Sequence, residues 1–159
     1  MKEMPKDVET EAYVGIAGPV AGSVAALACY ALAREFDSRL LLALAYAGCF
    51  LNLFNLIPVS PLDGGRITAI VSPRLWLLGV PVLAAAFFWR PSPILILVAI
   101  LALPQLKAAW NWDALAPANQ HYYAVSNEDK FTYGVFYLAL IVFLSLMVHG
   151  LHTELGPAH

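Results

Sequence analysis

The chain has 159 residues, of which 60% are hydrophobic and 13% are charged, and its formal net charge is −2. Soluble domains average about 45–50% apolar and about 25% charged residues, so this composition indicates an integral membrane protein. The sequence has no basic patch and so gives no case for a nucleic-acid-binding function, and the length allows one compact domain at most.

Residues 1–11 form a charged, mixed lead-in. This lead-in is not a signal peptide, because the apolar run after it is too long and has no clear cleavage site. We expect a membrane-embedded core at residues 12–151 and a short tail at residues 152–159. Cys29 and Cys49 lie inside apolar segments without a CxxC spacing, so we expect small buried side chains rather than a disulfide or a thiolate zinc site.

The first apolar segment, residues 12–33, carries no charge and is long enough to cross a hydrocarbon core. Gly18 and Gly22 form a small-xxx-small pair within it, which lets another helix approach closely. A second span at residues 40–57 ends with Asn52 and Asn55, which are three residues apart and so share one helical face. Taken alone, such asparagines predict hydrogen bonding between membrane helices.

The remaining segments complete a helical membrane bundle. Residues 59–73 are expected to be an irregular, partly polar connection, and residues 75–89 and 94–106 form a hairpin of two helices that are short for a full crossing. Residues 107–130 form a polar, aromatic loop that is expected along the membrane interface, and residues 131–151 form the last span. The sequence thus predicts an all-α, multi-pass transmembrane bundle of about five hydrophobic segments.

The basic residues predict the orientation of this bundle. If every span crosses, one side holds Lys2, Lys6, Arg66, Arg74, Lys107 and Lys130, and the other side holds Arg34, Arg39 and Arg90. The excess of positive charge places the N-terminus and the connection after the second span in the cytoplasm.

Asp63 is the residue most suggestive of function. It lies in the run NLIPVSPLDGGR at residues 55–66, directly after the second span. An ionisable group at membrane depth is costly, and it is therefore a functional-site hypothesis. Two prolines break the helix here, two glycines let the backbone bend tightly, and an asparagine is able to pair the carbonyls that the break frees.

A carboxylate in this setting has several possible roles. It can ligate a metal, act as an acid or base, relay protons, or pair with a buried cation. Zinc accepts an Asp oxygen, and a catalytic zinc site uses three protein ligands and a water. The alternative is a structural ion pair between Asp63 and Arg66, three residues further along.

The run at residues 55–66 resembles the Asn-x-x-Pro-x-x-x-Leu-Asp-Gly motif of the site-2 protease family of intramembrane zinc metalloproteases. Residues 17–19 resemble the Ala-Gly-Pro element of the same family. The resemblance covers roughly residues 11–71, and the later helices fit only loosely. It implies a zinc metallopeptidase in a bacterial or archaeal cell membrane that hydrolyses peptide bonds of membrane-embedded protein substrates.

The resemblance also implies roles for single residues. Asp63 matches the third zinc ligand of the family, and Asn55 matches an asparagine that helps to hold the substrate strand near the metal. The other matching positions break and turn the helix or belong to the Ala-Gly-Pro element: Gly18, Pro19, Pro58, Leu62, Gly64 and Gly65.

The family's His-Glu-x-x-His helix, which supplies two zinc ligands and the general base, has no counterpart here. His149 and His152 have helical spacing but lack the glutamate, so we expect interfacial histidines at a helix C-terminus. His121 is expected to be solvated, and His159 is in the tail. Because the lead-in resembles the end of the connection that follows the missing helix, we expect a chain that lacks at least one N-terminal helix and is inactive alone.

Three functions therefore stay open. The first is an incomplete intramembrane zinc protease, whose complete site would hold Zn²⁺. The second is a non-catalytic relative that binds membrane segments, and the third is a small transporter in which Asp63 relays ions. The expected partners are a membrane-embedded protein substrate, the lipid bilayer, and either the missing helix or a second copy of the chain.

Overall fold

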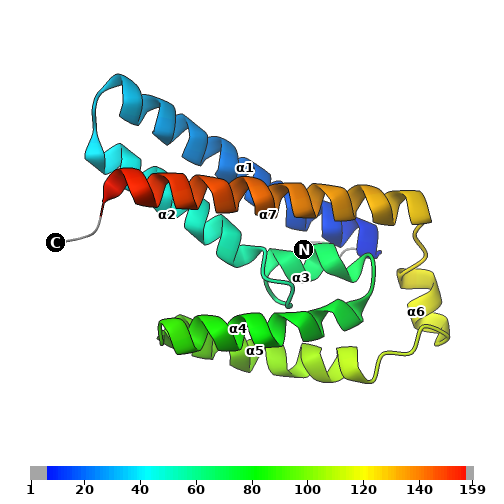
Figure 1. The fold of residues 1–159 in the computed structure, drawn as a ribbon. Helices are drawn as coiled ribbons and strands as arrows, with labels where there is room; N and C mark the ends of the chain where they lie inside the picture. The colour runs from blue at the N-terminus through cyan, green and yellow to red at the C-terminus, as the bar shows by residue number, and fades with distance from the viewer. Residues whose placement is uncertain (1–6, 157–159) are drawn as a thin grey trace, which may run out of the picture.

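The computed structural model describes residues 7–156, and every regular element in that part of the chain is a helix. The elements in chain order are α1 (Val8–Glu35), α2 (Arg39–Asn55), α3 (Asp63–Ala69), the 3₁₀ helix η1 (Pro73–Leu78), α4 (Gly79–Trp89), α5 (Pro93–Trp110), α6 (Pro117–Tyr122) and α7 (Asn127–Leu155). Figure 1 shows α1, α2 and α7 grouped together, with α3 continuing in the direction of α2. The predicted lead-in up to residue 6 and the tail from residue 157 lie outside the described residues.

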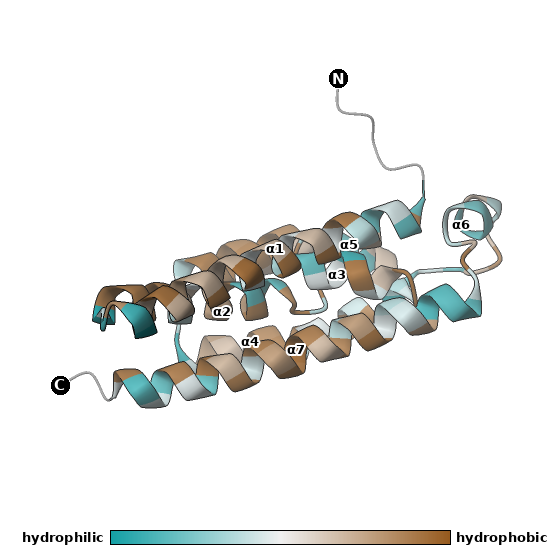
Figure 2. Ribbon diagram, turned by 90° about the horizontal axis from the view of Figure 1, so that it is seen from above, coloured by the Kyte–Doolittle hydropathy of each residue, from teal (hydrophilic) through white to brown (hydrophobic). Residues whose placement is uncertain are grey.

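The helices form a membrane-spanning bundle. α1, α5 and α7 are long and apolar enough to cross a membrane, and α2 and the η1–α4 segment are shorter apolar helices. Large apolar side chains such as Val24, Leu101 and Leu146 are at least half exposed. Faces of this kind suit lipid rather than water. Figure 2 shows the hydrophobic residues along the middle of the long helices and the hydrophilic residues mainly towards the helix ends. The all-α membrane bundle predicted from the sequence is confirmed.

Polar residues mark where several helices begin. The Asp7 carboxylate accepts a hydrogen bond from the Thr10 N–H at 2.7 Å, and this bond holds the pKa of Asp7 below its usual value. The Ser126 hydroxyl accepts from the Asp129 N–H at 3.1 Å at the start of α7. Such N-caps satisfy amide groups that have no partner inside the helix.

The main core lies between α1, α2 and α7. Its buried side chains include Ala26, Ala45, Cys49 and Leu144. Gly48 faces Ala26, where a Cβ added at Gly48 would lie 3.3 Å from the alanine Cβ. Small residues at this interface let the two helices approach closely. Cys49 is buried, as the sequence predicts, whereas Cys29 is half-buried, and both are free.

The hairpin of α4 and α5 forms a separate layer, which Figure 1 shows apart from α2 and α7. Its own core contains Leu83, Leu95 and Val98, together with Val59 from the connection after α2. The two helices form the predicted hairpin, but α5 extends to Trp110 and is long enough to cross a membrane, so the prediction that both helices are short is wrong for α5. The connection after α2 thus lies between the two layers and contacts both.

Two predicted connections contain helices. The segment expected to be irregular at residues 59–73 includes α3, and the aromatic loop at residues 107–130 includes α6 and the end of α5. The second and third residues of α3 are glycines, which are poor helix formers. Five of its seven residues are buried against neighbouring elements, so tertiary packing rather than local propensity forms this helix.

Candidate functional site

The connection from α2 to α3 folds back against its own backbone. α2 ends at Asn55, the chain turns through residues 56–62, and α3 begins at Asp63. A Cβ added at Gly64 would overlap the Leu56 carbonyl, and one added at Gly65 would overlap the backbone of Val59 and Ser60. The neighbouring atoms are main chain and have no side-chain freedom to move away, so only glycine fits at either position.

Side chains from three elements pair the carbonyls of this turn. The Tyr137 hydroxyl of α7 donates to the Leu56 carbonyl at 2.5 Å, and the Trp76 indole N–H of η1 donates to the Gly65 carbonyl at 2.7 Å. The Thr68 hydroxyl donates to the Gly64 carbonyl at 2.8 Å. The sequence interpretation, in which an asparagine pairs the freed carbonyls, is wrong for these groups. Nothing local in the sequence indicates Tyr137 or Trp76, because both are distant along the chain.

Asp63 lies against the glycine face of α1. A Cβ added at Gly18 would lie 3.2 Å from the Asp63 Oδ2 atom, and one added at Gly15 would lie 3.1 Å from the Asp63 carbonyl oxygen. One turn further along α1, a Cβ at Gly22 would overlap the Asn52 carboxamide. Gly18 and Gly22 of the predicted small-xxx-small pair thus face polar side chains of α3 and α2, and the backbone of α3 approaches α1 at Gly15.

The Asp63 carboxylate is half-buried and has no hydrogen bond or ion pair to any of residues 7–156. In that range the ion pair is Arg34–Glu154, with 3.2 Å between the charged atoms, so the alternative Asp63–Arg66 ion pair is not formed. Ala17 and Gly18 are exposed. The carboxylate thus lies beside a strip of α1 that no described element covers.

Asn55 is the last residue of α2 and is half-buried. Its carboxamide makes no hydrogen bond to the described part of the chain, and the same holds for Asn52. Both amides are therefore available to an external backbone. Asn52 is a candidate polar site residue that the motif alone does not identify. Its carboxamide faces Gly22, so Asn52 and Asp63 lie against the same face of α1.

The described residues do not by themselves fit a catalytic zinc ion. Nowhere in residues 7–156 do three His, Cys, Asp or Glu side chains come together in a way that could hold a metal. His149 and His152 are exposed near the end of α7. His149 lies twelve residues beyond Tyr137, which is about 18 Å of helix. Asp63 therefore supplies one carboxylate, and the other ligands of a zinc site are not among these residues.

Comparison with known proteins gives one informative similarity. The chain is 33% identical over 109 residues to a zinc metalloprotease of Methanocaldococcus jannaschii, a match that covers 65% of this chain and 32% of that protein. The chain is thus a distant relative of a metalloprotease and spans about a third of its length. No family model matches the sequence, and no solved structure matches significantly.

Gly64→Ala tests the close approach in the turn. Because the new Cβ overlaps a carbonyl that is held by Tyr137, we expect a loss of about 3 kcal/mol or more in unfolding free energy. The measurement is thermal unfolding of the purified protein in detergent. Gly134→Ala is the matched control, since nothing lies within 4 Å of its added Cβ, and it should stabilise α7 slightly. Equal stability of the two variants contradicts the prediction.

Tyr137→Phe tests the hydrogen bond that α7 makes to the turn. Removing the hydroxyl leaves the Leu56 carbonyl without this donor, and we expect a loss of about 1–3 kcal/mol in unfolding free energy. The control is Tyr46→Phe, a half-buried tyrosine of α2 whose hydroxyl has no partner among residues 7–156. If both substitutions have the same effect on denaturant unfolding, the bond does not hold the turn.

Proposed function

We propose that this chain is the Asp63-bearing part of an intramembrane zinc metalloprotease of the site-2 type, which hydrolyses peptide bonds of membrane-embedded protein substrates. One observation carries the proposal. The Asp63 carboxylate is held without a partner among residues 7–156, beside the exposed Ala17 and Gly18 of α1. The similarity to the M. jannaschii metalloprotease supports the same class.

In this proposal Asp63 is one metal ligand, and the remaining ligands and the general base come from outside the described residues. The segment that carries them would lie along α1 beside Gly18, where small exposed residues leave room for a helix. The described residues hold a single ligand, so we propose that this chain alone binds no catalytic zinc and cleaves no peptide bond.

Asn55 and Asn52 are proposed to hold the substrate backbone. Helical substrates must expose backbone amides and carbonyls before a peptide bond can be cut. A carboxamide offers both a donor and an acceptor to such an exposed strand. Asn55 directly precedes the turn that presents Asp63, so its amide is placed near the carboxylate along the chain.

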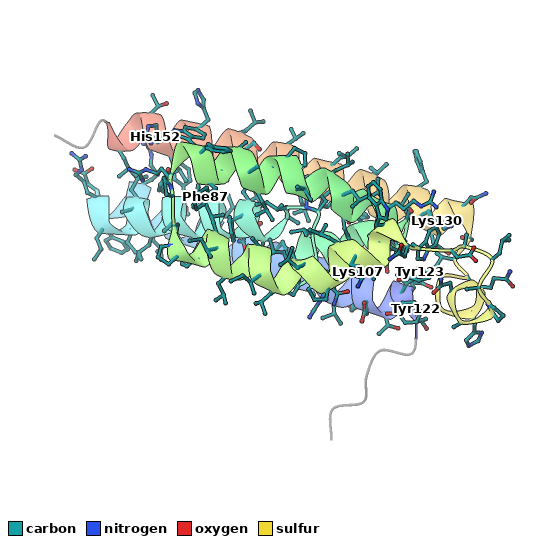
Figure 3. The ribbon with its side chains drawn as sticks, turned by 90° about the horizontal axis from the view of Figure 1, so that it is seen from below. Phe87, Lys107, Tyr122, Tyr123, Lys130 and His152 are labelled. Carbon is teal, nitrogen blue, oxygen red and sulfur yellow. The ribbon has the colours of Figure 1, made fainter. Side chains whose placement is uncertain are left out.

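The end of the bundle that carries Lys107 and Lys130 is proposed to face the cytoplasm. Figure 3 shows these lysines together at one end, with Phe87 and His152 towards the other. Arg66 lines a pocket together with Tyr122 and Tyr123, and Arg74 donates a hydrogen bond to the Trp112 carbonyl. Arg34 and Arg39, in contrast, contact the C-terminal end of α7. The positive-inside rule supports this orientation.

A non-catalytic relative that binds membrane segments is the second candidate, and it is favoured by the lack of a complete ligand set in residues 7–156. The two candidates differ in what Asp63 does. In a binding relative, replacement of Asp63 changes no metal content. In a protease part, Asp63 is needed for metal once the remaining ligands are supplied.

The test supplies those ligands in trans. The chain is co-expressed with the region of the M. jannaschii relative that precedes the matched residues, and zinc is measured by mass spectrometry in the co-purified complex. We expect about one zinc ion per complex, its loss in Asp63→Asn, and little zinc in the chain alone, because three protein ligands are needed. Cleavage of a fluorescent membrane-embedded substrate should follow the zinc content.

Asp37→Asn is the matched control. Asp37 is an exposed carboxylate in the turn between α1 and α2, and its positive φ of 47° is tolerated by asparagine. This variant should keep zinc and activity. A complex that retains its zinc in Asp63→Asn refutes the ligand role, and stoichiometric zinc in the chain alone refutes the claim that it is incomplete.

A further inference from the structure

A polar pocket of about 340 Å³ lies at the lysine end of the bundle, separate from the Asp63 carboxylate. Its walls come from six parts of the chain: the first turns of α1, the turn between α2 and α3, α3 itself, η1, the end of α5, and α6 with the residue after it. The residues used below are Glu11, Arg66, Trp76, Gln105, Tyr122 and Tyr123. Neither the metalloprotease similarity nor the proposed metal chemistry assigns a role to this pocket.

The pocket holds two opposite charges that do not neutralise each other. Glu11 and Arg66 both line it, and within residues 7–156 they form no ion pair. The Arg66 guanidinium and the Gln105 carboxamide also have no hydrogen-bond partner in that range. A guanidinium recognises a phosphate or carboxylate through two parallel hydrogen bonds. The free groups therefore suit a ligand that carries both a negative and a positive charge.

Aromatic rings form a fixed wall of the pocket. The Trp76 indole is held by its hydrogen bond to the Gly65 carbonyl, and the rings of Tyr122 and Tyr123 pack edge to face with centroids 4.9 Å apart. Burial and then the Glu11 carboxylate raise the pKa of Tyr122, so its hydroxyl stays protonated at neutral pH beside that carboxylate. A ring face next to a carboxylate is a favourable environment for an ammonium group.

The pocket lies at the level where lipid headgroups are found. Figure 3 shows Tyr122 and Tyr123 at the same end as Lys107 and Lys130, and tyrosine and lysine are typical of the membrane interface. Leu101 precedes Gln105 on α5 by about one helical turn, and Leu97 precedes it by about two. Both leucines are more than half exposed. Because residues four apart share a helix face, an apolar strip leads from the pocket towards the bilayer centre.

We propose that this pocket binds a phosphoethanolamine group, with Arg66 on the phosphate and Glu11 and Gln105 on the primary ammonium. The apolar strip of α5 would contact the acyl chains of a lipid, so it favours phosphatidylethanolamine over free phosphoethanolamine as the source of this group. A glycerol headgroup would leave the Glu11 carboxylate uncompensated beside an anion. A choline headgroup has no N–H to donate to Glu11 or Gln105, so it forfeits these charge-assisted bonds.

The experiment is native mass spectrometry of the purified full chain in detergent, with equimolar phosphatidylethanolamine, phosphatidylglycerol and phosphatidylcholine of identical acyl chains. We expect the wild type to retain phosphatidylethanolamine about tenfold better than the other two, the effect of about one charge-assisted hydrogen bond. Arg66→Gln should lose this retention, and Glu11→Gln should lose the preference for the ethanolamine headgroup.

Two controls separate the pocket from general surface charge. Lys107→Gln removes a cation at the same end, and Glu9→Gln removes a carboxylate in the same helical turn as Glu11. Both residues are exposed and neither lines the pocket. Both variants should keep the wild-type preference. If a pocket variant does not fold, the three-lipid comparison on the wild type decides alone.

Equal retention of the three lipids, a preference for phosphatidylglycerol or phosphatidylcholine, or unchanged selectivity in both pocket variants overturns the proposal. Competition by soluble O-phosphoethanolamine identifies the source. If O-phosphoethanolamine displaces the lipid at a concentration similar to that of the lipid, the pocket recognises the headgroup chemistry and a soluble ligand is supported. Failure to displace a selectively retained phosphatidylethanolamine supports the lipid itself.

Discussion

The close approach of the α2–α3 turn to its own backbone is the constraint on which the rest of the site depends. Gly64 and Gly65 lie against the main chain of residues 56–60, and any side chain at either position would overlap it. With this approach, α3 starts directly beside the end of α2 and Asp63 faces α1. Without it, the chain would leave α2 in another direction and the carboxylate would not reach Gly18.

α1 provides the complementary surface. Its glycines at positions 15, 18 and 22 meet the α3 backbone, the Asp63 carboxylate and the Asn52 carboxamide in turn. Helix association in a membrane depends on packing and on polar contacts, since lipid is as apolar as the side chains. A glycine face therefore does two things here. At Gly15 it lets the α3 backbone approach α1, and at Gly18 and Gly22 it leaves space in which polar side chains of the next helices lie close to α1.

The sequence predicts the parts of this arrangement that depend on local chemistry. Uncharged apolar runs mark the membrane segments, and the two glycines after Asp63 mark the tight turn. Tyr137 and Trp76 were not predicted, because their hydrogen bonds join residues 81 and 11 positions apart and leave no local pattern. α3 was missed for a related reason, since a seven-residue helix with two glycines exists only through burial. The Asp63–Arg66 pairing suggested by spacing is absent from residues 7–156, because α3 directs Asp63 towards Gly18, whereas Arg66 lines the polar pocket.

The contrast between the polar groups of the turn and Asp63 bears on function. The carbonyls of Leu56, Gly64 and Gly65 all accept side-chain hydrogen bonds, so residues of three elements hold the turn and the start of α3 in place. The Asp63 side chain, in the same few residues, has no such partner in residues 7–156. A half-buried carboxylate without a partner costs folding free energy that a neutral residue would not. This cost fits the proposed role of Asp63 as a ligand for a metal bound beside α1, where Gly18 is exposed.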